Sequence, residues 1–274
     1  MPEGPEIRRA ADTVAEALVG KTASEVWFGL VQCKPFEKML SGKQVIAIET
    51  RGKAMLTHFD CSLSIYSHNQ LYGRWYTSPA GYTPDTKRSL RLAIHNDSVS
   101  ALLYSASDIA VLDKEGVDNH PFLNRLGPDI LAVDTTTEMV FSRLQDRRFH
   151  RRRLGALLTD QSFVAGLGNY LRCEILFAAE LHPAQRPMDI VPNRLHQLTE
   201  LMLALPRQSY TTRGITNDLK RAEALIADGI CFEDARFHLF RRAGKPCYRC
   251  GTIIEKRTDA GQACYICPKC QINQ

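Results

Sequence analysis

The sequence contains no apolar run that approaches the roughly 18 residues of a membrane-spanning helix. Its first residues, MPEGPEIRR, carry acids and prolines, whereas a signal peptide needs a basic flank followed by an apolar stretch. No internal repeat or low-complexity tract is evident. These absences argue against a membrane-spanning or secreted protein and favour one that works in the cytoplasm.

The composition is typical of a folded globular chain with a mild basic excess. Hydrophobic residues make up 44% and charged residues 24%, and the formal net charge is +5. A length of 274 residues suits one large domain or two ordinary ones. The charge permits a polyanionic partner, but it does not establish one.

Hydrophobic patterning predicts an α+β chain in several parts. Apolar residues at helical spacing from Pro5 to Leu18 predict an N-terminal helix that Gly20 ends. Short β-favouring segments then predict an antiparallel sandwich or barrel that completes an N-terminal domain over residues 1–113. Residues 114–135 are rich in Gly, Pro and Asp and are predicted to be an interdomain linker.

The second half is predicted to be helical up to residue 236. Its helical runs are TTEMVFSRLQD with a threonine cap, then LGALLTDQ, GNYLRCEILFAAEL and RLHQLTELMLALP. The last of these is expected to end near Pro206. Residues 237–274 are predicted to form a separate tail with two short strands.

Cysteine is abundant, but its distribution does not indicate a disulfide framework. Nine cysteines are present without an export signal. Four of them form two Cys-x-x-Cys pairs in the tail, namely Cys247, Cys250, Cys267 and Cys270. Two such pairs on a hairpin can close a tetrahedron of thiolates around one zinc ion. We predict a structural zinc site, with free buried thiols as the alternative and Cys264 as a hairpin side chain.

The N-terminus offers an amine with useful chemistry. Because Pro2 is small, we expect Met1 to be removed, which leaves a proline with a free secondary amine. An α-amino group has a pKa of about 7.7–8.0, against about 10.4 for lysine, so more of it is neutral. Such an amine can attack a sugar aldehyde carbon while Glu3 moves protons. The alternative is an ordinary N-terminus where both residues only start a helix.

Several motifs occur in a specific order along the whole chain. They are MPEGPEIRR, Arg51-Gly52-Lys53, Gln70-Leu71-Tyr72, the run from Asp160-Gln161 to Gly166-Leu167-Gly168-Asn169-Tyr170, and the four-cysteine tail. Together they resemble the formamidopyrimidine-DNA glycosylase and endonuclease VIII family, most closely its bacterial endonuclease VIII branch. The resemblance implies an N-terminal β-sandwich, a helical domain with a helix–two-turn–helix, and a C-terminal zinc hairpin.

The resemblance assigns catalytic roles to three residues. Pro2 matches the family nucleophile, which attacks C1′ of a damaged nucleotide, displaces the base and forms a Schiff base. Glu3 matches the proton donor that opens the sugar ring. Lys53 matches a lysine that contacts phosphate and assists elimination, although by itself it would be interpreted as a solvated charge on a turn.

The resemblance also assigns DNA contacts. Gln70, Leu71 and Tyr72 resemble a wedge that fills the gap left by an extruded base. Asn169 matches a DNA-binding asparagine, and Arg125 matches a DNA-contacting arginine. Without the resemblance, the triplet would be interpreted as part of a strand with Leu71 in the core. Asn169 would be interpreted as a helix cap, and Arg125 as a surface charge.

Further features near Asn169 bear on phosphate binding. Gly166 and Gly168 can let the backbone approach a phosphate, and the helix that follows presents N–H groups to it. Glu174, one turn later, is interpreted as structural. A dense basic run forms either a solvated face or a contact with the DNA backbone; it comprises Arg147, Arg148, Arg151, Arg152 and Arg153.

One position departs from the family pattern. The family hairpin carries an arginine that grips phosphates at the lesion and is tied to the second elimination, whereas this chain has Gln262 there. Glutamine keeps hydrogen-bond donors but loses the fixed charge and the bidentate fork. We expect weaker lesion binding and impaired δ-elimination, unless Lys256 or Arg257 on the same hairpin substitutes.

The resemblance implies a bifunctional DNA glycosylase and abasic-site lyase that excises oxidised pyrimidines from duplex DNA and cleaves the strand by β-elimination, with δ-elimination left open. It also implies a nucleoid-associated bacterial monomer with one structural zinc ion. The purine-directed sister enzyme, which acts on formamidopyrimidines and 8-oxoguanine, typically begins MPELPE and disperses its wedge residues, so both features favour pyrimidines here. A zinc-stabilised DNA-binding protein without catalysis is the third alternative, against which the combination of Pro2, Glu3 and Lys53 argues.

Overall fold

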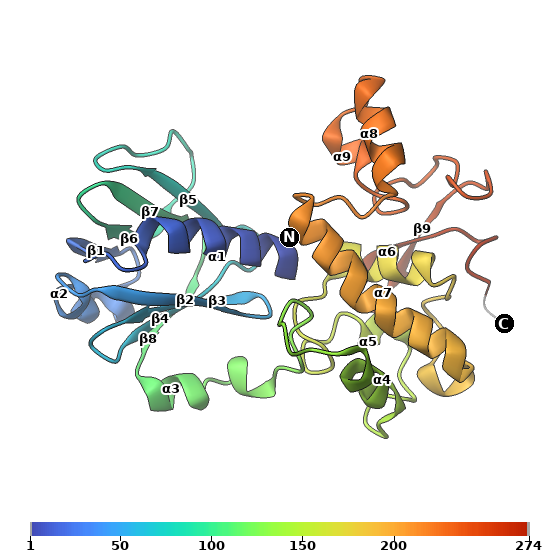
Figure 1. Cartoon of the computed structure of the whole chain (residues 1–274), viewed down its shortest axis with the longest axis horizontal. Helices are drawn as coiled ribbons and strands as arrows, with labels where there is room; N and C mark the ends of the chain where they lie inside the picture. Colours follow the sequence, from blue (N-terminus) through green and yellow to red (C-terminus); the bar gives the residue numbers. More distant parts are fainter. Residues whose placement is uncertain (1, 273–274) are drawn as a thin grey trace. The chain divides into compact units, whose positions relative to one another are not determined.

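The computed structural model describes residues 2–272, and the chain forms two compact units (Figure 1). The first contains Pro2 and Glu6–Arg125, and the second contains Glu3–Pro5 and the chain from Leu126 onward. Strands dominate the first unit and helices the second, so the predicted α+β architecture is confirmed. Within the described residues, no helix combines the length and the apolarity needed to cross a bilayer.

The first unit is a sandwich of two four-stranded antiparallel sheets, ordered β1-β6-β7-β5 and β2-β3-β4-β8. Its strands are β1 (Glu25–Phe28), β2 (Val45–Arg51), β3 (Ala54–Phe59), β4 (Ser64–His68), β5 (Arg74–Pro79), β6 (Leu90–His95), β7 (Val99–Tyr104) and β8 (Asp108–Leu112). The helical segments before β2 are α1 (Gly4–Leu18), η1 (Val31–Phe36) and α2 (Glu37–Leu40). The apolar face of α1 and the inner faces of both sheets form one core, in which Val14, Phe28 and Ile65 are fully buried.

Strand β8 lies at the end of the predicted sandwich domain, and the expected linker contains helical structure. β8 pairs with β4 along its whole length and completes the second sheet. Residues 114–135 contain α3 (Lys114–Asp118), which Asp113 caps, and η2 (Leu123–Arg125). These helices are too short for a helical period to be visible in the sequence.

The second unit packs helices around one core and ends in a β-hairpin. Its elements are α4 (Thr137–Gln145), α5 (Leu154–Leu157), α6 (Asn169–Ala178), η3 (Pro187–Asp189), α7 (Pro192–Thr211), α8 (Leu219–Ala227), α9 (Phe232–Ala235), β9 (Glu255–Asp259) and β10 (Gln262–Ile266). Thr136 caps α4, as predicted, by accepting a hydrogen bond from Met139 N at 3.3 Å. β9 and β10 pair as the predicted hairpin between the two cysteine motifs.

Helix α7 does not end near Pro206, as predicted, but continues to Thr211. Proline lacks the N–H that would bond one turn back, so the helix loses a hydrogen bond at this position. The last turns are held by packing, since Ser209 is fully buried and its Oγ lies 2.9 Å from the Tyr170 hydroxyl. Tertiary contacts therefore outweigh the local signal of the proline.

Candidate active site and zinc hairpin

The four tail cysteines bring their sulfur atoms together at one end of the hairpin. All four Sγ atoms lie within 4.8 Å of one another, with 3.4 Å between Cys250 and Cys267 and 3.9 Å between Cys247 and Cys270. Sulfur ligands at about 2.3 Å from a tetrahedral zinc ion lie about 3.8 Å apart, so the spacing fits zinc. Four thiols complete the coordination shell, which makes this a structural zinc site.

Cys264 lies outside this cluster, as predicted. It is 1% exposed on β10 and shares a hydrogen bond with the thiol of Cys173 on α6. That hydrogen bond and burial raise the pKa of Cys173 well above its ordinary value. The two thiols therefore pack α6 against the hairpin.

Glu3 is fixed at the N-terminus of α6, and partly exposed Pro2 directly precedes it. The Glu3 side chain is buried; Oε1 accepts from Tyr170 N at 2.8 Å and Oε2 from Leu171 N at 3.3 Å. The first N–H groups of a helix lack intrahelical partners and carry partial positive charge, so they suit a carboxylate. Glu3 thus takes the N–H groups that the sequence had suggested for a phosphate.

The glycines before α6 make room for the chain around Glu3. Gly4 N donates to Gly166 O at 2.8 Å, and a Cβ at Gly4 would lie 3.1 Å from Gly166 Cα. A Cβ at Gly168 would lie 2.5 Å from Glu3 Oε1. The space that was predicted to admit a phosphate is therefore used by residues 3 and 4.

Asn169 does not cap α6, because Gly168 occupies the N-cap position. Asn169 Nδ2 donates to Ala263 O in the hairpin at 2.9 Å, and Asn169 Oδ1 accepts from Arg172 Nη2 at 2.6 Å. The capping alternative is therefore wrong, and DNA contact by Asn169 stays a prediction. Arg172 was not predicted as a site residue, although an arginine within the apolar run GNYLRCEIL is a visible signal.

Gln262 is exposed at the start of β10 and pairs with Asp259 across the hairpin turn. Both cations considered as substitutes, Lys256 and Arg257, are exposed on β9. Arg257 forms an ion pair with Glu255 at 2.7 Å. Its charge is therefore partly neutralised by Glu255, and substitution of Arg257 or Lys256 for the family arginine stays a prediction.

Lys53 is not a solvated charge, because only 8% of it is exposed. It follows Gly52, which has a φ of 61°, in the turn between β2 and β3. Burial and then the charge of Lys53 lower the pKa of His68 on β4, while Asp108 opposes them. His68 Nδ1 accepts from Gln70 N at 3.1 Å, which places the proton of the neutral ring on Nε2. His68 was not predicted as a site residue, although it lies two positions before the predicted wedge in the sequence.

The loop between β4 and β5 exposes the predicted wedge. Leu71 is 57% and Tyr72 70% exposed, so the alternative of a buried strand is wrong. Gln70 has a φ of 50°, and Gly73 N donates to Asn69 O at 2.7 Å to close the turn. A side chain at Gly73 would collide with Asn69. An aliphatic group and an aromatic ring thus project from a constrained loop.

Arg125 is exposed at the end of η2, with its guanidinium 5.6 Å from the Phe122 ring centroid.

A polar cluster in the same unit was not predicted. Tyr66 OH donates to Asp108 Oδ2 at 3.3 Å, and the ring of His120 lies 4.1 Å from that of Tyr66. Burial, followed by Asp108, raises the pKa of Tyr66, and burial lowers the pKa of His120. Isolated residues of these types have no spacing that sequence analysis could detect.

The basic run between α4 and α5 is partly neutralised. Arg148 pairs with Asp146 at 2.7 Å, and Arg152 pairs with Asp160 at 2.6 Å. The other members, Arg147, Arg151 and Arg153, are exposed. The run therefore combines local ion pairs with a solvated positive face, and DNA contact by it stays a prediction.

Glu174 is structural, as interpreted from the sequence. Its buried carboxylate accepts from Leu239 N and Phe240 N through Oε1, each at 2.8 Å. Oε2 accepts from His238 N and from Thr216 Oγ1, also at 2.8 Å. These bonds fix the segment that leads into the hairpin.

The predicted site residues fall into two groups within the two units. Unit one contains Pro2, Lys53, Gln70, Leu71, Tyr72 and Arg125, and unit two contains Glu3, Asn169, Gln262 and the four zinc-site cysteines. In unit two, hydrogen bonds join Glu3 to α6 and Asn169 to the hairpin.

Comparisons with known proteins cover nearly the whole chain. Family models for the formamidopyrimidine-DNA glycosylase N-terminal domain and H2TH domain match residues 1–107 and 126–218. Endonuclease 8 of Salmonella typhimurium is 49% identical and that of Pectobacterium carotovorum 47% identical, over 99% of this chain and 100% of each relative. A solved complex between the Lactococcus lactis Fpg and abasic-site DNA has a TM-score of 0.82 at 19% identity, covering 99% of this chain and 100% of that chain. The fold is thus a β-sandwich, an H2TH helical domain and a four-cysteine hairpin.

Proposed function

The chain belongs to the formamidopyrimidine-DNA glycosylase family, and from this premise we propose that it excises oxidised pyrimidines from duplex DNA. It is a bifunctional DNA glycosylase with abasic-site lyase activity in base excision repair. Its proposed partner is double-stranded DNA with a damaged base or an abasic site, bound by a monomer in the bacterial cytoplasm. The net charge of +5 suits such a polyanion.

Pro2 is the proposed nucleophile. Its secondary amine forms a bond to C1′ of the damaged nucleotide, and the base leaves with the electron pair of the broken C1′–base bond and with the proton that the amine loses. Glu3 then gives a proton to the ring oxygen, so that the sugar opens and leaves an iminium ion between Pro2 and C1′. The iminium draws electrons from C2′, which loses a proton, and the C3′–O bond to phosphate breaks in β-elimination. Lys53 is proposed to contact the phosphate and assist this step.

The proposed DNA contacts have separate tasks. Leu71 and Tyr72, supported by Gln70, would fill the gap left by the extruded base. Asn169 and Arg125 would bind phosphates and so position the damaged strand. Gln262 stands where a charged fork would otherwise grip the lesion phosphates, so we propose weak δ-elimination.

The hydrogen bonding of Glu3 is the observation that carries this proposal. Glu3 directly follows the proposed nucleophile in the sequence, and its carboxylate accepts hydrogen bonds from Tyr170 N and Leu171 N. An acid that only started α1 would be expected to face solvent near that helix, yet Glu3 is 1% exposed. A fixed carboxylate on the residue that follows Pro2 in the sequence supports a role for Glu3 in proton transfer during catalysis.

Borohydride trapping on an abasic-site duplex tests the proposal. Borohydride reduces the iminium to a stable amine, so wild-type protein should form a covalent adduct that peptide mass spectrometry assigns to Pro2. Met1 lies outside the described residues, and the same spectra would establish whether it has been removed. An adduct on a lysine, or fully active protein with a blocked terminus, would contradict the role of Pro2.

The base preference needs a second measurement. Wild-type protein should excise thymine glycol faster than 8-oxoguanine from otherwise identical duplexes. Faster excision of 8-oxoguanine would instead support the purine-directed alternative. Specific binding without trapping or strand cleavage would support a zinc-stabilised DNA-binding protein.

A further inference from the structure

Arg172 is the largest side chain that is fully buried among the described residues. It lies in the first turn of α6, three positions after Asn169. Burying a guanidinium is costly unless hydrogen bonds replace its water, and apolar residues of similar volume often serve packing better. Its contacts should therefore show what the arginine does.

The guanidinium of Arg172 bonds to three separate segments. Nη1 donates to Gly155 O at 3.1 Å and to Asp259 O at 3.4 Å. Nη2 donates to Asn169 Oδ1 at 2.6 Å and to Ala263 O at 3.3 Å. The Asp259 carboxylate is farther away, with Oδ2 3.5 Å from Nη1. Main-chain carbonyls and an amide, rather than one close carboxylate, satisfy most of this charge.

These bonds fix the orientation of the Asn169 carboxamide. An arginine can only donate, so its partner atom on Asn169 must be the oxygen. Asn169 Nδ2 then faces Ala263 O, to which it donates at 2.9 Å. Nδ2 carries two N–H groups, and the second is the donor that a phosphate oxygen would accept from. Without Arg172 the amide could rotate and present its oxygen, which repels a phosphate.

Arg172 also holds both sides of the hairpin turn that carries Gln262. Asp259 ends β9, Ala263 follows Gln262 on β10, and the carbonyl oxygen of each accepts a hydrogen bond from the guanidinium. Because one rigid planar group bonds to both strands and to Asn169, the turn and the start of α6 are held together.

We propose that Arg172 is a positioning residue that holds the Asn169 carboxamide and the Gln262 turn in one arrangement for gripping phosphates of the damaged strand. This inference rests on the proposed DNA-binding role of Asn169. Arg172 itself is buried and acts through Asn169 and the turn.

A double-mutant cycle with Arg172→Met and Asn169→Ala tests this inference. The readout is the Kd for a duplex with a tetrahydrofuran abasic-site analogue, at fixed salt. Each single variant should weaken binding by about tenfold, the scale of one charge-assisted hydrogen bond. In the Asn169→Ala background, Arg172→Met should add less than about threefold, because coupled residues are not additive.

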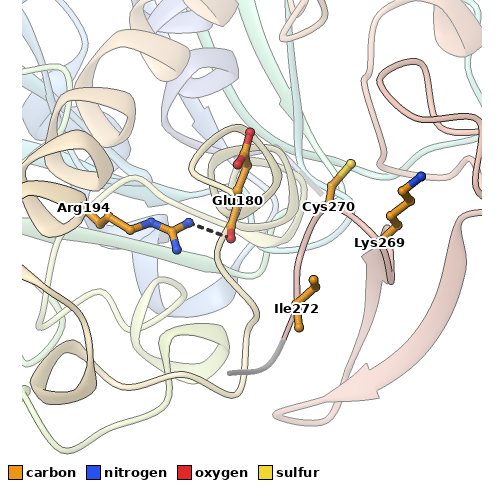
Figure 2. Close-up of a pocket in the computed structure, with 5 residues that line it drawn as sticks. All are labelled: Glu180, Arg194, Lys269, Cys270 and Ile272. Carbon is orange, nitrogen blue, oxygen red and sulfur yellow. Dashed lines mark hydrogen bonds between the residues drawn. The ribbon is translucent and has the colours of Figure 1, made fainter.

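Arg194→Met is the matched control. Arg194 donates to Ala179 O and Glu180 O at the opposite end of α6, as Figure 2 shows for Glu180. It is thus another arginine that bonds main-chain carbonyls of the same helix region, but it contacts neither Asn169 nor the turn. This variant should leave the Kd within about twofold of wild type, the size expected of a substitution with no shared partners.

Two outcomes separate a failure of this inference from a failure of the proposed function. Additive losses from Arg172→Met and Asn169→Ala, with an equal loss from Arg194→Met, would overturn the inference and leave Arg172 a general structural residue. If Arg172→Met does not fold, Arg172→Lys takes its place in the cycle with the same criteria, since lysine keeps the charge but not the fork. If wild-type protein binds damaged and undamaged duplex equally and is not trapped by borohydride, the proposed function itself fails.

Discussion

Gly168 and Glu3 are packed so closely that a Cβ at position 168 would lie 2.5 Å from Glu3 Oε1. Gly168→Ala should therefore push the carboxylate away from Tyr170 N and Leu171 N, which now hold it. Because proton transfer depends on the placement of the acid, we expect a loss of at least about tenfold in abasic-site cleavage, equivalent to about 1.4 kcal/mol. Single-turnover cleavage of an abasic duplex measures it.

Gly116→Ala is the control for this change. It also adds one methyl group to a glycine, but Gly116 lies in α3, where the nearest atom to a new Cβ is Asp113 Oδ1 at 3.1 Å. Its cleavage rate should match that of wild type. Equal rates for Gly168→Ala and wild type would show that catalysis does not need Glu3 at the helix terminus.

The exposed Gln262 predicts a gain of function on substitution. Gln262→Arg should restore a bidentate charged group on the hairpin turn, tighten binding to the abasic analogue by about three- to tenfold, and raise the ratio of δ- to β-elimination product. Arg257→Gln is the comparison, because Arg257 is already paired with Glu255 and should change the ratio little. Unchanged affinity and product ratio in Gln262→Arg would contradict the role given to this position.

Zinc removal should weaken DNA binding by the second unit and leave the first unit folded. Replacing Cys267 with serine removes one of four ligands, so we expect loss of one bound zinc equivalent and loosening of the hairpin from α6. Because Asn169 bonds to Ala263 in that hairpin, affinity for the abasic analogue should fall by at least about tenfold.

The matched control for zinc removal is Cys231→Ser, an exposed cysteine outside the cluster. It should retain zinc and affinity. Both tryptophans of the chain, Trp27 and Trp75, lie in the first unit. Their fluorescence therefore reports the unfolding of that unit, and the urea midpoint should be the same in both variants. A Cys267→Ser protein that keeps full affinity would show that the hairpin does not support DNA binding.

Periodicity and motif spacing predicted much of the fold. The β-favouring segments, the Thr136 cap and the cysteine hairpin are local patterns, and the structure contains them. The continuation of α7 beyond Pro206 depends on the burial of Ser209, which is a tertiary effect and cannot be detected within the helix sequence.

The candidate site was predicted less completely, for a related reason. Lys53 was identified through a family motif, yet its burial depends on the fold around the β2–β3 turn. Arg172 and His68 have no motif, and their roles come from partners distant in sequence, such as Ala263 for Arg172 and Asp108 for His68. Contacts between segments far apart in the chain decide these roles, and residue spacing carries no information about them.

The pKa of His68 and that of His120 are both lowered from 6.5, mainly by burial, so the first unit should lose stability in acid. A histidine with a depressed native pKa binds its proton more readily in the unfolded chain. Its contribution is therefore complete above pH 6.5 and is lost as the pH falls through the native pKa. His68→Gln should reduce the slope of unfolding free energy against pH by up to about 1.4 kcal/mol per pH unit between pH 6.5 and the lower native pKa of His68. Urea unfolding followed by tryptophan fluorescence at several pH values measures the slope. The control is Tyr66→Phe, which alters the same cluster without removing an imidazole. It should lower the free energy of unfolding but keep the wild-type slope. An identical slope in His68→Gln and wild type would mean that His68 titrates alike in the folded and unfolded chain, against the burial that the structure gives it.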